Sequence, residues 1–181
     1  MANEFNNEGK KVGLWIKKYD NGQIQEERNY VDGVRNGVYK TYYMNGQVET
    51  KKHYKNGNLH GTYETFYSDG TLNSIRTLVD GEIVGEFKEF FQNGILKKDA
   101  IHSKTSTTTQ NIKYFPNGKV KVDVNIKNGA MHGPYKEYYS NGILHIECIY
   151  NENGKIDGQY KEYDQDGNLI KEIVYSNGIK N

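Results

Sequence analysis

A glycine, a strip of aromatic residues and an Asn-Gly or Asp-Gly pair recur along this chain at a fixed interval, as in the segment GPYKEYYSNG that begins at Gly133. With the leading residue of each unit counted as position 0, units begin 24 residues apart at Gly13, Gly37, Gly61, Gly85, Thr109, Gly133 and, after one inserted residue, Gly158. A fixed period of this length is typical of arrays in which one supersecondary element stacks on the next. The sequence therefore predicts a single repeat domain over residues 1–181, with about seven units preceded by an N-terminal half unit.

Each unit contains two turn signals, which predicts that the repeated element is a β-hairpin. One Asn-Gly or Asp-Gly pair occupies positions 8 and 9 of every unit, and a second pair occupies positions 19 and 20 of most units. Such pairs favour two-residue type I′ turns, in which both central residues have positive φ. The segments between the turns are rich in Tyr, Phe, Val, Ile and Thr, as strands are. We therefore expect an all-β protein, an elongated and twisted antiparallel β-meander of tandem 24-residue hairpin repeats.

Two-residue turns would also fix the register, so that position 6 faces position 11 and position 3 faces position 14. Opposed residues share a face of the sheet. One face then carries positions 2, 6, 11 and 17, which are mostly aromatic or aliphatic, as in Tyr39, Tyr43, Val48 and Tyr54. The opposite face pairs charged residues, with one like-charge exception: Lys88 with Asp99, Lys136 with Glu147, Lys161 with Glu172, and Lys40 with Lys51.

Position 5 is aromatic in six units, although it belongs to the otherwise polar face. We call these residues the aromatic column: Tyr42, Phe66, Phe90, Tyr114, Tyr138 and Tyr163. One interpretation is a sheet twisted enough to bury both faces in part. The other is a contact stripe for a partner protein, because aromatic residues are enriched in interface hot spots. The second interpretation gives our hypothesis for the protein-binding residues.

Composition narrows the classes of function. A net charge of +1 argues against electrostatic binding of nucleic acid. No apolar run has the length of a membrane span, and the N-terminus shows no secretory signal. The one cysteine, Cys148, is expected to be a small core residue and cannot form an internal disulfide, which favours a cytoplasmic location. No arrangement of residues indicates a catalytic centre, a cofactor or a metal site, so we expect no enzyme.

The pattern G-x-[YF]-x-x-[YF]-[YF]-x-[ND]-G-x-[ILV], as in GPYKEYYSNGIL from Gly133, resembles the MORN repeat (membrane occupation and recognition nexus) in the variant form common in bacteria. The resemblance covers residues 5–181. It implies an elongated twisted sheet without catalytic residues, with roles in scaffolding, partner binding and, in some members, lipid contact. Many such proteins are described as antitoxins. The chain departs from the pattern at residues 100–111, where Lys104-Thr105 replaces a turn pair, and this degenerate seam is either a harmless lapse or a flexible joint.

From these features we expect a protein-binding module, one form of which is an antitoxin or immunity protein that binds a partner toxin. The alternatives are a membrane-apposed scaffold and a self-associating structural array. Membrane lipid is less favoured, because acids at position 14 oppose most lysines at position 3 and the net charge is near zero. The strand from Lys171 to Tyr175 is expected near an open sheet edge, which predicts weak homodimerisation.

Overall fold

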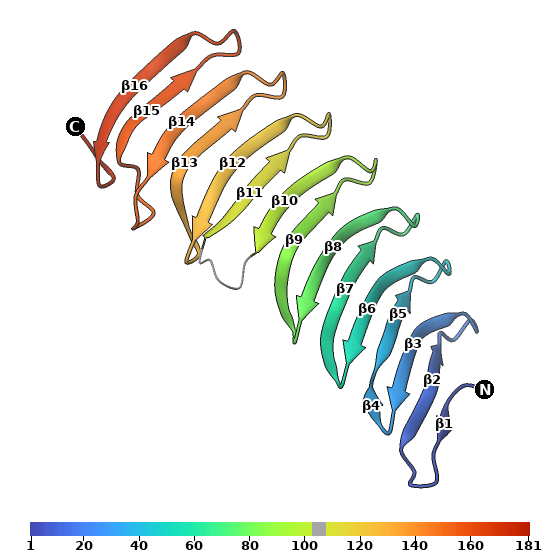
Figure 1. Cartoon of the computed structure of the whole chain (residues 1–181). Coiled ribbons are helices and arrows are strands. Elements are labelled where there is room, and N and C mark those ends of the chain that lie inside the picture. The colour runs from blue at the N-terminus through green and yellow to red at the C-terminus, as the bar shows by residue number, and fades with distance from the viewer. Residues whose placement is uncertain (103–107) are drawn as a thin grey trace. The chain divides into compact units, whose positions relative to one another are not determined.

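The computed structural model describes residues 1–102 and 108–181, and every regular element in those residues is a β-strand (Figure 1). The chain forms two compact units, the first made of Met1–Gly85 with Gln92–Gly94 and the second of Glu86–Phe91 with Ile95–Asn181. The first unit contains β1 (Glu4–Phe5), β2 (Lys11–Lys18), β3 (Ile24–Val31), β4 (Val34–Arg35), β5 (Gly37–Tyr42), β6 (Val48–Lys55), β7 (Asn58–Phe66) and β8 (Leu72–Val79). Strand β9 (Glu82–Phe90) contributes residues to both units. The second unit contains β10 (Leu96–His102), β11 (Thr108–Tyr114), β12 (Val120–Lys127), β13 (Ala130–Tyr138), β14 (Leu144–Tyr150), β15 (Gly158–Tyr163), β16 (Leu169–Ser176) and β17 (Ile179–Lys180).

Within each unit the strands form an antiparallel meander, in which each strand pairs with its neighbour in the chain. In the first unit β1 pairs with β2, β2 with β3, and β5 through β8 pair in order; β3 also pairs with both β4 and β5. In the second unit β10 through β17 pair in chain order. The all-β meander of tandem hairpins expected from the sequence is confirmed.

The turns at positions 19 and 20 have the predicted type I′ conformation. Asp32, Asn56, Asp80, Asn128 and Asn177 all have φ between +48° and +54°, and the glycine after each also has positive φ. A turn with positive φ at both central residues matches the twist of the flanking strands. These five Asn-Gly and Asp-Gly pairs therefore act as the sequence predicted. In Asn153-Gly154, a sixth pair expected to form such a turn, only the glycine has positive φ, so the prediction is wrong there.

The turns at positions 8 and 9 are different, and the prediction of two-residue type I′ turns there is wrong. Of the first such pair only Gly22 has positive φ. The amide of Gly22 donates to the carbonyl of Tyr19 at 2.9 Å, and the amide of Tyr19 donates to the carbonyl of Gln23 at 2.8 Å. This is a three-residue loop, a type I turn followed by a left-handed glycine, which is the next most common hairpin connection.

A β-bulge near each of these loops changes which residues share a face. In β13 and β14, Tyr138 lies opposite Leu144, and the register then shifts so that Lys136 lies opposite Glu147. The bulge thus restores the expected pairing of positions 3 and 14, which is also seen for Lys161 with Glu172 and for Lys40 with Lys51. Position 11, however, lies opposite position 5, so its assignment to the face of positions 2 and 17 is wrong. Position 6 lies just before the loop, where the amide of Tyr19 donates to the carbonyl of Gln23 at position 10.

The most buried side chains all lie on the face that carries positions 2, 4, 13, 15 and 17, which we call the tyrosine face. The face with positions 1, 3, 5, 11 and 14 is called the column face. The described residues with the least solvent exposure are Tyr30 and Leu78 at position 17, Ala100, Val124 and Cys148 at position 15, and Ser74 at position 13. The sequence was therefore right that positions 2 and 17 mark the better buried side and that Cys148 is a core residue.

The hairpin register continues through the described part of the degenerate seam. Strand β10 pairs with β11 through Ile101 opposite Gln110 and Ala100 opposite Asn111. The Lys104-Thr105 turn lies outside the described residues. The altered sequence at the seam therefore leaves the pairing of these two strands in place.

Candidate protein-binding faces

Each residue of the aromatic column lies at or near the end of an odd-numbered strand, from Tyr42 in β5 to Tyr163 in β15, and each is half-buried. In the first unit Tyr42 lies opposite Val48 and Phe66 opposite Leu72. In the second unit the pairs are Tyr114 with Val120, Tyr138 with Leu144, and Tyr163 with Leu169. Within each unit the column is therefore half of a wider apolar row, in which aromatic and aliphatic side chains alternate from strand to strand.

Sequence reasoning missed the aliphatic half of this row. The signal was present, because Ile, Val or Leu recurs at position 11 in every 24-residue repeat. A two-residue turn placed those residues on the other face, and only the bulge brings them beside the column.

Two column hydroxyls connect neighbouring repeats. The hydroxyl of Tyr42 donates to Glu27 Oε2 at 2.8 Å, and that of Tyr163 donates to Glu147 Oε1 at 2.8 Å. Burial raises the pKa of Tyr42 to about 12, and the carboxylate of Glu27 adds to that effect. These two tyrosines thus contribute to packing between repeats while each remains partly exposed.

A row of charged residues lies beside the apolar row on the column face. Its members, at positions 3 and 14, form ion pairs between adjacent strands: Lys51 Nζ lies 2.9 Å from Glu64 Oε2, and Lys40 Nζ lies 3.8 Å from Glu27 Oε2. In the second unit Lys161 Nζ lies 3.8 Å from Glu172 Oε1. Exposed pairs of this kind add about 0–1 kcal/mol each to stability. Their effect here is to place a polar border beside an apolar row.

The three-residue loops hold the backbone of the column residues in place. The hydroxyl of the tyrosine at position 6 donates to the carbonyl at position 5 of the next repeat. This bond runs from Tyr43 to Phe66 at 2.8 Å and from Tyr139 to Tyr163 at 2.9 Å. The side-chain amide of Asn45 donates to the carbonyl of Ser68 in the next loop at 2.6 Å. The column is therefore presented on a backbone that is hydrogen-bonded from repeat to repeat.

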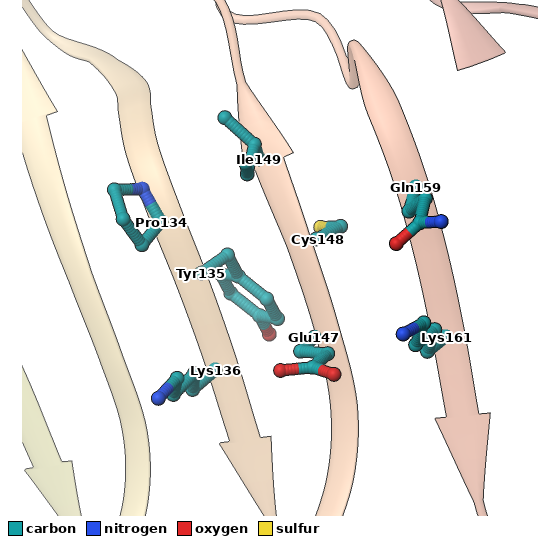
Figure 2. A pocket seen from close by; sticks show the side chains of 8 residues that line it. All are labelled: Pro134, Tyr135, Lys136, Glu147, Cys148, Ile149, Gln159 and Lys161. Carbon is teal, nitrogen blue, oxygen red and sulfur yellow. The ribbon is translucent and has the colours of Figure 1, made fainter. Parts of the chain in front are cut away.

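On the second unit, a shallow pocket lies across β13, β14 and β15, and Figure 2 shows Tyr135 and Cys148 among the side chains that line it. Burial raises the pKa of the Cys148 thiol to about 11, so the thiol is protonated near neutral pH and is a poor nucleophile. The charged groups at the pocket are Lys136, Glu147 and Lys161, which belong to the ladder of opposed charges on adjacent strands.

The described residues contain neither a cluster of metal ligands nor a helical membrane span. Across residues 1–102 and 108–181, no group of three or more His, Cys, Asp or Glu side chains could hold a metal ion. That part of the chain also contains no helix long and apolar enough to cross a membrane.

Stacked antiparallel hairpins with repeating side-chain rows define a tandem β-hairpin repeat protein. The chain belongs to the MORN repeat variant family, whose model matches residues 11–32, 35–56, 59–80, 83–102, 110–128, 131–152 and 156–177. This family is a non-catalytic repeat module that binds proteins or membranes. No curated protein matches the chain.

Proposed function

We propose that this chain is a protein-binding module and that its partner lies along the aromatic column. The observation that carries the proposal is the apolar row of positions 5 and 11, which the charged row of positions 3 and 14 borders. Protein interfaces have this organisation, with an apolar centre and a polar rim. Large aromatic anchors supply most of the binding energy in such interfaces, and the column offers one anchor in each of six repeats.

The finer proposal is that the partner is a toxin and that the chain is an antitoxin or immunity protein. The resemblance to bacterial MORN variants supports it. A rigid surface without a catalytic arrangement would neutralise a toxin by covering part of its surface, which requires contact area and no chemistry. A cytoplasmic location belongs to the same proposal.

The alternatives are a membrane-apposed scaffold and a self-associating array, with weak homodimerisation as one form of the latter. On the column face an anionic bilayer would meet lysines and acids side by side, since Lys51 pairs with Glu64 and Lys161 with Glu172. Attraction to anionic lipid depends on clustered cations. The column face therefore supports a protein partner better than a lipid surface.

The test is a double alanine variant, Tyr114→Ala with Tyr138→Ala, in the full chain. Co-expressed with the product of the adjacent gene, the wild type should co-purify as a complex. The double variant should bind with a free energy weaker by several kcal/mol, at hot-spot costs of about 2 kcal/mol each. The complex should be quantified by calorimetry with the purified partner.

Tyr135→Ala is the matched control, because Tyr135 lies on the tyrosine face of the same strand as Tyr138 and packs edge-to-face on Tyr150 at 5.8 Å. This control should lower thermal stability and leave partner binding unchanged at temperatures where it is folded. Two results would overturn the proposal: an unfolded double variant, which would make the column core, or binding to anionic vesicles without any protein complex.

A further inference from the structure

All three arginines of the chain lie on the tyrosine face of the first unit, and Lys11 and Lys52 are the two lysines of that face that lie over aromatic rings. Three of these five cations occupy position 15, directly opposite an aromatic residue at position 2: Arg28 faces Trp15, Lys52 faces Tyr39, and Arg76 faces Tyr63. The other two, Lys11 and Arg35, each stand two residues before the start of a 24-residue repeat, and Arg35 lies opposite Tyr30. We call the five residues the basic row: Lys11, Arg28, Arg35, Lys52 and Arg76.

The cations of the basic row lie over aromatic rings. Lys11 Nζ is 4.3 Å from the centre of the Trp15 ring, and Lys52 Nζ is 4.6 Å from that of Tyr63. The guanidinium of Arg76 is 4.1 Å from the ring centre of Tyr63, and those of Arg28 and Arg35 are 5.8 Å and 5.5 Å from Tyr39 and Tyr54. These distances lie in the range of cation–π contacts, so the rings hold the cations in fixed positions.

Most of this positive charge is not neutralised. Of the basic row only Arg28 has a carboxylate within ion-pair distance in the described residues, with Nη2 at 2.6 Å from Glu26 Oε2. Burial raises the pKa of the Tyr30 hydroxyl, but the nearby guanidiniums of Arg28 and Arg35 outweigh it and hold the pKa below its usual value. Two buried donors, Trp15 Nε1 and Arg28 Nε, have no acceptor in that part of the structure. The face therefore offers cations and hydrogen-bond donors in excess of acceptors.

The repeat fold does not require these cations. In the second unit position 15 carries the apolar residues Ala100, Val124, Cys148 and Ile173, and the first three are buried. Half-burying a cation without a nearby acid destabilises the fold, whereas burying a methyl group stabilises it. A face selected for stability alone would use apolar residues in both units, so the basic row indicates a ligand.

We propose that the basic row binds an acidic, extended segment of a protein, which crosses the strands of the first unit. Position 15 recurs on every second strand, so Arg28, Lys52 and Arg76 are spaced at about 9.6 Å, twice the distance between neighbouring strands. A segment in the extended polyproline II conformation has three residues per turn and advances about 3.1 Å per residue, so carboxylates at every third residue lie on one side and repeat about every 9.3 Å. This surface is on the other face from the aromatic column, and the inference does not depend on the proposed function.

The depth of the cations favours a polypeptide over a bilayer. Each residue of the basic row is half-buried and lies along a ring instead of extending outward. A hollow lined by Lys11, Trp15, Arg28 and Tyr30 opens on the same face. A single chain can place a carboxylate between neighbouring rings, whereas the headgroup plane of a membrane is too broad to do so.

The experiment measures fluorescence anisotropy of a labelled glycine-serine peptide that carries glutamate at every third position. The wild-type full chain should bind it with an affinity that falls as salt increases. A Lys52→Val, Arg76→Val variant, which copies the apolar position 15 of the second unit, should lose about tenfold or more in affinity, the equivalent of one charge-assisted contact. Circular dichroism should confirm that the variant retains its sheet.

The matched control is Lys40→Val with Lys51→Val, which removes the same charge from the column face of the first unit. It should bind the peptide as the wild type does, and so should the Tyr114→Ala, Tyr138→Ala variant. If both double valine variants lost the same affinity for the peptide, the attraction would be non-specific and the proposal would be overturned. Three other results would also overturn the proposal. The wild type could fail to bind the peptide, bind equally well a peptide with all its glutamates in one block, or bind phosphatidylserine vesicles in place of the peptide.

Discussion

Among single residues, the asparagine at position 8 contributes most clearly to both the hairpin and the stacking of hairpins. In Asn117 the Oδ1 atom accepts from the amide of Lys119 at 3.1 Å, which closes an Asx turn inside the loop. The Nδ2 group donates to the carbonyl of Ser140 in the next loop at 2.8 Å. One side chain thus shapes its own loop and connects it to the neighbouring repeat.

Replacing Asn117 with alanine should therefore destabilise the fold. Two exposed hydrogen bonds are lost, at a combined net cost of about 1 kcal/mol. The measurement is the midpoint of urea unfolding, with Asn117→Asp as the control, because aspartate keeps the acceptor of the Asx turn and should be intermediate. An alanine variant as stable as the wild type would show that this side chain does not connect the loops.

At the scale of the element, each hairpin repeat uses the same dipeptide in two conformations. Asn128 of the Asn128-Gly129 turn has φ of +51°, whereas in Asn117-Gly118 only the glycine has positive φ. The first turn selects residues that tolerate the left-handed region, and the second selects a side chain that can accept hydrogen bonds. The same Asn-Gly dipeptide is therefore subject to different conformational requirements at the two ends of a strand.

Substitution of each asparagine by glycine should separate the two roles. Asn128→Gly should leave the free energy of unfolding within about 0.5 kcal/mol of the wild type, because glycine adopts positive φ without strain. Asn117→Gly should lose about 1 kcal/mol or more, because its side-chain hydrogen bonds disappear and the unfolded chain gains freedom. Chemical unfolding of both variants in one buffer makes the comparison, and equal costs would contradict the assignment of two turn types.

The same comparison shows how far the sequence alone could predict the fold. The period, the strands and the pairing of Lys136 with Glu147 follow from spacing, and the structure has them. The faces of positions 6 and 11 did not follow, because Asn-Gly suits both a two-residue turn and a three-residue loop with a bulge. Pro116 was the available signal, since proline is favoured at the second residue of a type I turn. The basic row could be read as Arg28, Lys52 and Arg76 at equal intervals, but only side-chain geometry shows the rings beneath them.

At the scale of the whole molecule, the tyrosines should set an upper pH limit on stability. Burial, with an added effect of nearby carboxylates, raises the pKa of Tyr39, Tyr42 and Tyr160 to about 12, against an ordinary value of 10.0. The folded state thus favours the protonated phenol. This contribution to stability is fully present below about pH 10 and is lost as the pH rises toward 12.

We therefore expect the thermal midpoint to fall steeply between about pH 10 and 12 after little change between about pH 7 and 9. A spectrophotometric titration of the tyrosinate should show a fraction of the 16 tyrosines ionising only as the protein unfolds. If all 16 ionise together near the ordinary pKa with the fold intact, the hydroxyl contacts from Tyr42 to Glu27 and from Tyr163 to Glu147 are not stable in solution.

The pairing of each strand with its neighbour in the chain has a consequence for folding. In the first unit a single hairpin turn separates each pair of partner strands from β5 to β8, and the short β4 separates β3 from β5. Contacts between residues so close in sequence form quickly, because little loop entropy is lost in closing them. A strand leaving the ribosome therefore finds its partner already made, and the protein can assemble one hairpin at a time during synthesis without exposing a completed sheet that awaits a distant segment.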